Sequence, residues 1–198
     1  DANDVRDYSN VQHSVHTFYN HTFVGKHILT VGGDYMRDYL MSYQFANNGS
    51  KHQYTVDGFA QFDWNPTKYF NVITGLRFDY YSDSDINHFS PKLGLMYKIG
   101  NCSLRGSYAG GFRAPTLKEM YMNFDMASIF MIYGNPDLKP ETSHNFSLSA
   151  EYMKGRYNLT VTGFYNVVDN RITTAWSEAL KGQVYTNISN IRISGAEA

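Results

Sequence analysis

Apolar side chains recur at every second position through most of this 198-residue chain. From Tyr54 to Trp64, one set of alternate residues is apolar or small, while the other contains Thr, Asp and Gln around a single Phe. The same period returns at 70–80, 144–152 and 157–167. Because successive side chains of a strand point to opposite faces, whereas a helix repeats about every 3.6 residues, the pattern predicts β-strands. Weaker versions predict strands at 11–23, 27–41, 91–99 and 102–110, and a ninth strand beginning near Val184.

The predicted strands are long, and their apolar rows carry aromatic residues near both ends. They run 9 to 15 residues, whereas strands of globular proteins usually have about 5–6. The aromatic pairs are Tyr54 and Trp64, Phe70 and Tyr80, and Tyr157 and Tyr165. This spacing is typical of two aromatic girdles, one at each interface between membrane and water.

The connections between the predicted strands alternate in length. Short ones lie at 24–26, 65–68, 99–101 and 154–156, and long ones at about 42–52, 82–90, 111–142 and 170–184. Outer-membrane barrels have short periplasmic turns and long extracellular loops in this order. We therefore predict an all-β fold, a transmembrane antiparallel up-and-down β-barrel. A soluble β-sandwich binding module is the alternative, because its strands also alternate.

Composition excludes several other classes of protein. The 32 aromatic residues (Tyr 17, Phe 13, Trp 2) and the charged fraction of only 18% exclude a disordered chain. A net charge of −1 gives no support to nucleic-acid binding. The single cysteine, Cys102, has no internal disulfide partner. The longest apolar run, Ile129 to Tyr133, is far short of the roughly 20 residues that a spanning helix needs.

The two ends of the sequence also carry information. The chain begins at Asp1 without an initiator Met or a leader pattern, and it ends at 195–198 while a strand pattern is still running. We therefore expect residues 1–198 to be a part of a longer protein.

The connection at 111–142 contains two recognisable boxes. The first is Phe112, Arg113, Ala114 and Pro115, and the second is Asn135, Pro136, Asp137 and Leu138, followed by Lys-Pro-Glu. They resemble the TonB-dependent outer-membrane receptors, in which a Phe/Tyr-Arg-Ala-Pro box precedes an Asn-Pro-x-Leu-Lys-Pro-Glu box. Weaker matches to the same family lie, in the family's order, before the boxes at 75–80 and 89–95 and after them at 163–166, 169–172, 185–187 and 195–197.

The resemblance implies a barrel of about 22 strands closed by an N-terminal plug. Residues 1–198 would supply about nine of those strands, with the plug and the remaining strands outside this chain. The implied function is import of haem, cobalamin or a ferric siderophore across the outer membrane of a Gram-negative bacterium, with no catalysis and no resident cofactor. The implied partners are the TonB–ExbB–ExbD complex, outer-membrane lipid and a surface lipoprotein.

The two boxes have a structural and a functional interpretation. In the structural one, Arg113 pairs with a carboxylate such as Glu119 or Glu141 and braces a corner. In the functional one, the boxes hold a ligand lid. The lid residues would be Met120, Tyr121, Met122, Met126, Phe130, Met131 and Tyr133. Soft, adaptable side chains of this kind suit a flat or greasy ligand, although they also serve as packing residues.

One departure from the family concerns haem. Haem receptors of this family carry a His between the two boxes as a candidate iron ligand, whereas no His lies between Pro115 and Asn135. The departure weighs against haem and leaves cobalamin and ferric siderophores open.

A second candidate site lies in the connection at 82–90. Asp83 and Asp85, with His88 nearby, offer carboxylate oxygens of the kind that Ca²⁺ prefers. They would also fit the carboxylate and His set of an outer-membrane protease. This set defines the alternative hypothesis of a barrel enzyme, and a solvated acidic loop is the plainer interpretation.

Overall fold

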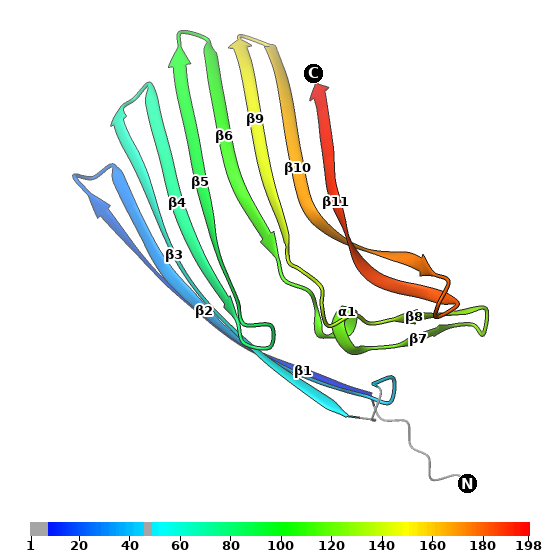
Figure 1. Cartoon of the computed structure of the whole chain (residues 1–198). Coiled ribbons are helices and arrows are strands. Elements are labelled where there is room, and N and C mark those ends of the chain that lie inside the picture. Colours follow the sequence, from blue (N-terminus) through cyan, green and yellow to red (C-terminus); the bar gives the residue numbers. More distant parts are fainter. Residues whose placement is uncertain (1–7, 46–48) are drawn as a thin grey trace.

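A computed structural model describes residues 8–45 and 49–198. It consists of long antiparallel strands with one small insertion (Figure 1). The long strands are β1 (Tyr8–Phe23), β2 (His27–Ser42), β3 (Ser50–Thr67), β4 (Phe70–Tyr81), β5 (Ile86–Ile99), β6 (Cys102–Arg113), β9 (Glu141–Lys154), β10 (Tyr157–Ser177) and β11 (Gly182–Glu197). The insertion holds the helix α1 (Leu117–Tyr121) and the strands β7 (Phe124–Met126) and β8 (Phe130–Tyr133).

All the strands belong to one curved sheet in the order β1-β2-β3-β4-β5-β6-β9-β10-β11-β8-β7. Each long strand pairs in antiparallel register with the next long strand along the chain. The nine predicted strands are therefore confirmed in number, position and pairing. Over the residues that the structure describes, the sheet does not close on itself, as expected for a segment of a barrel wall.

The two faces of the sheet differ in the way that the alternation predicts. On β3, the apolar Tyr54 and Val56 are exposed, whereas Gln53, Thr55 and Asp57, which alternate with them, are buried. Register carries this distinction from strand to strand, because directly paired residues point to the same face. We call the face that carries Tyr54 the outer face and the face that carries Asp57 the inner face.

The predicted long connections are shorter than expected at three places. Residues 82–85 and 178–181 are four-residue turns, and β3 already begins at Ser50. The polar residues near these turns remain in the ladder, because strands that continue past the membrane still pair their backbone groups. Only the connection at 111–142 keeps a long insertion, from 114 to 140.

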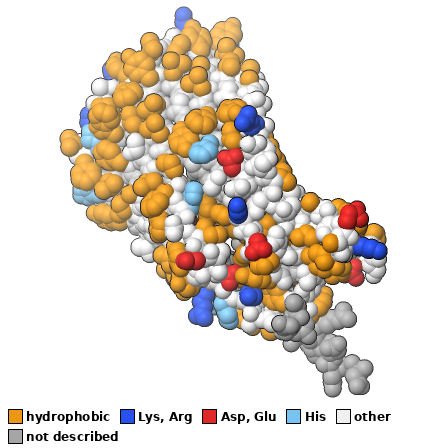
Figure 2. Space-filling view, in the orientation of Figure 1, with side chains coloured by type: hydrophobic (Ala, Val, Ile, Leu, Met, Phe, Trp, Pro, Cys, Tyr) orange, Lys and Arg blue, Asp and Glu red, His pale blue; other side chains and the backbone are white. Residues whose placement is uncertain are grey.

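The buried apolar core lies at the loop end of the sheet. Its residues are Leu40, Phe45, Leu117, Met120, Met122, Leu138 and Ile172. The core packs α1 and the second box against β2 and β10, so the insertion is fixed to the barrel wall. Most acidic side chains visible in Figure 2 also lie in the half of the molecule nearer the loops. Over residues 8–45 and 49–198, no helix has the length and hydropathy needed to cross a membrane.

Candidate ligand-binding rim

The first box ends β6 and starts α1. Ala114 and Pro115 are both buried, and proline ends the ladder because it has no N–H to donate. Thr116 is the N-cap of α1: its hydroxyl accepts from the Glu119 N–H at 3.2 Å, and the Glu119 carboxylate accepts from the Thr116 N–H at 2.9 Å. This reciprocal capping box stabilises a helix of only five residues.

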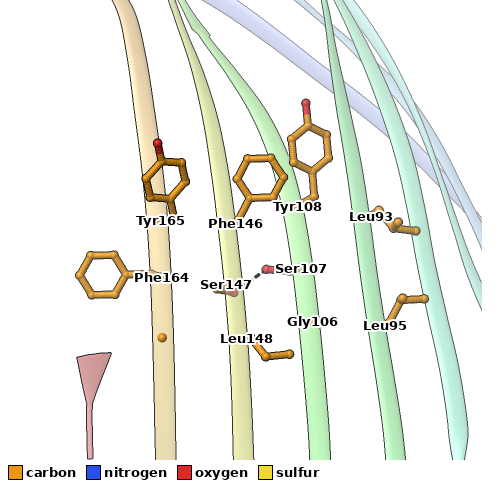
Figure 3. Close-up of a pocket in the computed structure, with 11 residues that line it drawn as sticks. Leu93, Leu95, Gly106, Ser107, Tyr108, Phe146, Ser147, Leu148, Phe164 and Tyr165 are labelled. Carbon is orange, nitrogen blue, oxygen red and sulfur yellow. Dashed lines mark hydrogen bonds between the residues drawn. The ribbon is translucent and has the colours of Figure 1, made fainter. Parts of the chain in front are cut away.

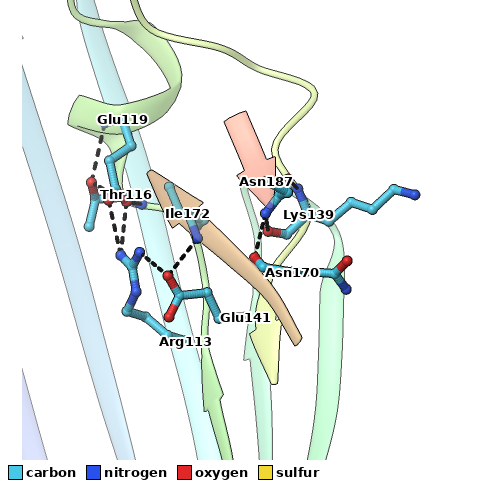
Figure 4. Close-up of polar contacts among 8 residues, drawn as sticks. All are labelled: Arg113, Thr116, Glu119, Lys139, Glu141, Asn170, Ile172 and Asn187. Carbon is cyan, nitrogen blue, oxygen red and sulfur yellow. Dashed lines mark hydrogen bonds and ion pairs between the residues drawn. The ribbon is translucent and has the colours of Figure 1, made fainter. Parts of the chain in front are cut away.

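Arg113 braces the corner from below (Figure 4). Its Nη1 donates to both carboxylate oxygens of Glu119, at 3.1 and 3.0 Å, and its Nη2 donates to Oε1 of Glu141 at 2.7 Å. The same Glu141 oxygen accepts from the Ile172 N–H of β10 at 2.7 Å. The hydrogen bond from Arg113 is the main reason why the pKa of Glu141 lies below its usual range. The predicted pairing of Arg113 is confirmed for both carboxylates.

The second box is tied to β11 by asparagines. Asn135 Nδ2 donates to the Tyr185 carbonyl at 2.9 Å. Asn187 accepts from the Lys139 N–H at 2.8 Å and donates to the carbonyls of Lys139 and Asn170, at 2.9 and 2.6 Å. Leu138 of the box is buried in the core. Both ends of the insertion are therefore anchored to long strands.

The predicted lid residues divide into two groups. Met120 and Met122 are each only 2% exposed and lie in the core, so they pack the insertion against the sheet. Met126 is 46% exposed, while Phe130, Met131 and Tyr133 are half-buried. The second group, and Tyr121, which is also half-buried, are accessible from the loop end of the sheet.

An exposed apolar tip lies where the β7–β8 and β10–β11 turns meet. Its members are Met126, Ile129, Phe130, Trp176 and Leu180, and all except the half-buried Phe130 are among the exposed large apolar side chains. The rings of Phe130 and Trp176 meet edge to face with centroids 6.3 Å apart. Parallel pairing of β8 with β11 brings the two turns together.

Tyr121 links the insertion to the neighbouring turns. Its hydroxyl donates to Asp83 at 3.0 Å, and Lys51 Nζ lies 3.9 Å from its ring centroid. Desolvation and the neighbouring Asp83 carboxylate raise the pKa of Tyr121 to about 12. This predicted ligand contact therefore bridges two loops.

The acidic candidate site does not come together as a cluster. Asp83 accepts from Tyr121, and Asp85 accepts from Tyr80 at 3.3 Å. His88 stacks on Phe112 of the first box, with ring centroids 4.4 Å apart. Within residues 8–45 and 49–198, no group of three His, Cys, Asp or Glu side chains is arranged to hold a metal ion.

Several parts of the rim had weak signals in the sequence or none. The residues 185–187 match the family, and their role is now clear, because Asn187 anchors the second box. The bond between Tyr121 and Asp83 joins residues 38 positions apart. The parallel contact of β8 with β11 involves only two residue pairs, which leave no periodic pattern.

Comparison with known proteins identifies the class to which this fold and rim belong. A family model described as "TonB dependent receptor-like, beta-barrel" matches residues 1–198. The chain therefore belongs to the TonB-dependent receptors and forms part of their β-barrel in the bacterial outer membrane.

Individual relatives carry iron-related names. The chain is 31% identical to an iron-regulated outer membrane virulence protein of Vibrio cholerae over 157 residues, which are 76% of this chain and 24% of the relative. It is 29% identical to the ferrienterobactin receptor of Escherichia coli over 128 residues, which are 59% of this chain and 17% of that receptor. The chain thus spans less than a third of the length of these relatives.

Solved structures show the same fold. The siderophore receptor PirA of Pseudomonas aeruginosa superimposes with a TM-score of 0.83 at 19% identity, over 94% of this chain and 38% of that receptor. The hemophore receptor HasR of Serratia marcescens does so with a TM-score of 0.76 at 16% identity, over 94% of this chain and 38% of that receptor.

Proposed function

We propose that the protein containing this chain is a TonB-dependent importer of an iron chelate, either a ferric siderophore or haem. The observation that carries the proposal is the anchored insertion at 114–140. Arg113 and Asn187 fix its two ends to the barrel wall, while its tip stays exposed and apolar at the loop end. Such an arrangement presents Met and aromatic groups to a ligand at the outer rim.

The relatives support iron over the other cargoes considered. Their names specify an iron-regulated protein, a ferrienterobactin receptor, and proteins for haemoglobin and haem. The absence of a His between Pro115 and Asn135 favours a siderophore over haem. The iron chelate is cargo, and we propose that the protein has no resident cofactor and no enzymatic activity.

The energy and the remaining parts come from outside residues 1–198. We propose that an N-terminal plug occupies the barrel and that the TonB–ExbB–ExbD complex drives transport, as in the family. A surface lipoprotein is a further candidate partner. Asp83, Asp85 and His88 each have other contacts, so we assign them to loop structure and not to hydrolysis.

Uptake by the full-length receptor tests the role of the accessible lid residues. Replacing Met126, Met131 and Tyr133 together by Ala should weaken the binding and uptake of ferric siderophore at least tenfold, or roughly 1.4 kcal/mol of binding. The three side chains lie outside the core, so the receptor should still assemble. Met153→Ala, at an exposed position near the opposite end of β9, is the matched control.

Parallel assays with haem and cobalamin distinguish the cargoes, with receptor abundance measured in each strain. Wild-type import of every candidate by the triple variant would show that these three side chains do not contact cargo. A defect for haem alone would mean that a Met or Tyr replaces the missing His.

A further inference from the structure

Cavities lie on both faces of the wall, and they differ in their chemistry. The recess on the outer face has a volume of about 470 Å³ and lies between Gly106 and Gly163, beside the rings of Tyr108 and Phe146 (Figure 3). None of the described residues that line it is charged, as expected for a surface that faces lipid. A second cavity, of about 320 Å³, lies on the inner face at the loop end. Only the second cavity is therefore on the surface that an imported molecule passes.

The second cavity lies between the wall and the insertion, and we call it the inner pocket. Asn10 and Gln12 of β1 and Asp38 of β2 supply its polar side. Leu40 and Leu117 also line it, and both are buried in the core that holds α1 against the sheet. The inner pocket thus combines a polar side with an apolar floor that is fixed in place.

Asp38 carries an unpaired charge into the inner pocket. Within residues 8–45 and 49–198, none of the ion pairs includes Asp38. Its hydrogen-bonding neighbour is the uncharged side chain of Gln12, which pairs with it in register. Lys118 also lines the pocket, but its Nζ lies 5.5 Å from the ring centroid of Tyr8. A partly buried carboxylate without a counter-ion favours the binding of a cation.

The next rows on the inner face add to the negative charge. Asp34 lies four residues before Asp38 on β2 and pairs with Asp57, which in turn pairs with Asp79. These three carboxylates share the guanidinium of Arg77, at 3.8, 2.8 and 2.9 Å respectively. Asp57 is only 7% exposed, and its Oδ1 has no hydrogen-bond partner in the part of the chain that the structure describes. Carboxylates therefore outnumber basic groups beside the pocket.

The other titratable groups nearby do not supply the missing cation. His16 Nδ1 lies 2.9 Å from a carboxylate oxygen of Asp34. Lys51 Nζ lies over the ring of Tyr121, whose hydroxyl donates to Asp83. Both groups thus have neighbours of their own, and Asp38 is left facing the pocket.

We propose that the inner pocket is a cargo subsite that takes a cationic amino group, so that the imported iron chelate carries a free ammonium group. The inference rests on the proposed function and specifies the chemical class of the cargo. An alkylammonium group can pair with Asp38 and donate to the amide oxygens of Asn10 and Gln12, while its methylene groups cover Leu40 and Leu117. Polyanionic ferric tris-catecholates, and haem with its two carboxylates, are repelled by the same face.

Binding to the detergent-purified, full-length receptor tests the subsite with two matched chelates. Ferrioxamine B is a ferric trihydroxamate with one terminal ammonium group, and its N-acetylated derivative lacks that charge. The wild type should bind the ammonium form at least tenfold more tightly. Asp38→Asn should abolish the difference by weakening the ammonium form alone. Lys118→Gln should widen it, because this change removes a competing cation from the pocket.

A control variant makes the same chemical change on the other face of the wall. Asp169 of β10 shares the outer face with Tyr165, four residues before it, and Asp169→Asn should keep the wild-type difference. Heat-modifiable gel mobility checks that each variant assembles. If Asp38→Asn does not assemble, Lys118→Gln carries the test, because Lys118 is exposed. Equal affinity of the wild type for the two chelates, or a difference that survives Asp38→Asn, would overturn the inference.

A ferric tris-catecholate separates this inference from the proposed function. Uptake of the tris-catecholate by the wild type, without a preference for the ammonium chelate, would overturn the inference and leave the import of iron chelates standing. Failure to import the three chelates and haem would instead contradict the proposed function, and the inference with it.

Discussion

Arg113 should hold the rim closed, and its removal should open the insertion locally. Arg113→Ala deletes three charge-assisted hydrogen bonds to Glu119 and Glu141. Such bonds contribute about 1.5–3 kcal/mol each when buried. The Arg113 side chain is 42% exposed, so we take about 1 kcal/mol per bond and expect the free energy of local opening to fall by about 2–3 kcal/mol.

Hydrogen exchange in the purified full-length receptor measures this opening. The amides of α1 and the Ile172 N–H, which donates to Glu141, should exchange roughly 30- to 150-fold faster in Arg113→Ala. Arg113→Lys keeps the charge but lacks the planar guanidinium group, so its exchange rates should lie between those of the wild type and Arg113→Ala. Lys139→Ala is the control on the same rim, because Lys139 contacts Asn187 through its backbone.

The same brace should depend on pH. Because Arg113 holds the pKa of Glu141 below its usual range, the ionised carboxylate stabilises the rim at neutral pH. This contribution is lost as the pH falls through the lowered pKa. The protection factor of the Ile172 amide, which is its exchange rate corrected for the intrinsic rate at each pH, should therefore fall in acid in the wild type and change less in Arg113→Ala. Unchanged exchange of α1 in Arg113→Ala, or an equal increase in Lys139→Ala, would refute the brace.

Three further predictions concern the wall and the insertion. Leu76→Arg on the outer face should block barrel assembly, because an arginine facing lipid near mid-membrane costs about 2–4 kcal/mol. Thr160→Arg on the inner face should still assemble. Heat-modifiable gel mobility measures the assembly of both variants. Tyr121→Phe should weaken the contact with the 82–85 turn by about 1 kcal/mol, seen as faster proteolysis of that turn. Gly134→Ala should lower surface abundance, because its Cβ would lie 2.8 Å from a backbone oxygen of α1. Gly49→Ala should leave surface abundance unchanged, because a Cβ at this position would have no atom within 4 Å.

Period-two alternation was sufficient to locate the nine long strands. The pattern at 54–64 also separated the exposed outer face from the buried inner face correctly, since apolar side chains must face lipid and polar ones the interior. The structural interpretation of the boxes also predicted that Arg113 pairs with a carboxylate such as Glu119 or Glu141, and the structure shows both pairs. These features are local, or follow from a repeat that every strand carries.

Other features became visible only in three dimensions. Met120, Met122 and Met126 belong to the same Met-rich stretch of the sequence, yet the first two are buried and the third is exposed. The difference depends on which side of the insertion packs against β2 and β10, and no pattern in the local sequence indicates which side that is.

The neighbours across the sheet show the same limit. Gly106, Leu148 and Gly163 lie up to 57 positions apart and become neighbours only through strand register. Alternation, strand length and the rhythm of the connections predicted a barrel wall, because all three are properties of consecutive residues. Which side chains share a surface could be seen only in the folded chain, because strand pairing joins residues that are far apart in the sequence.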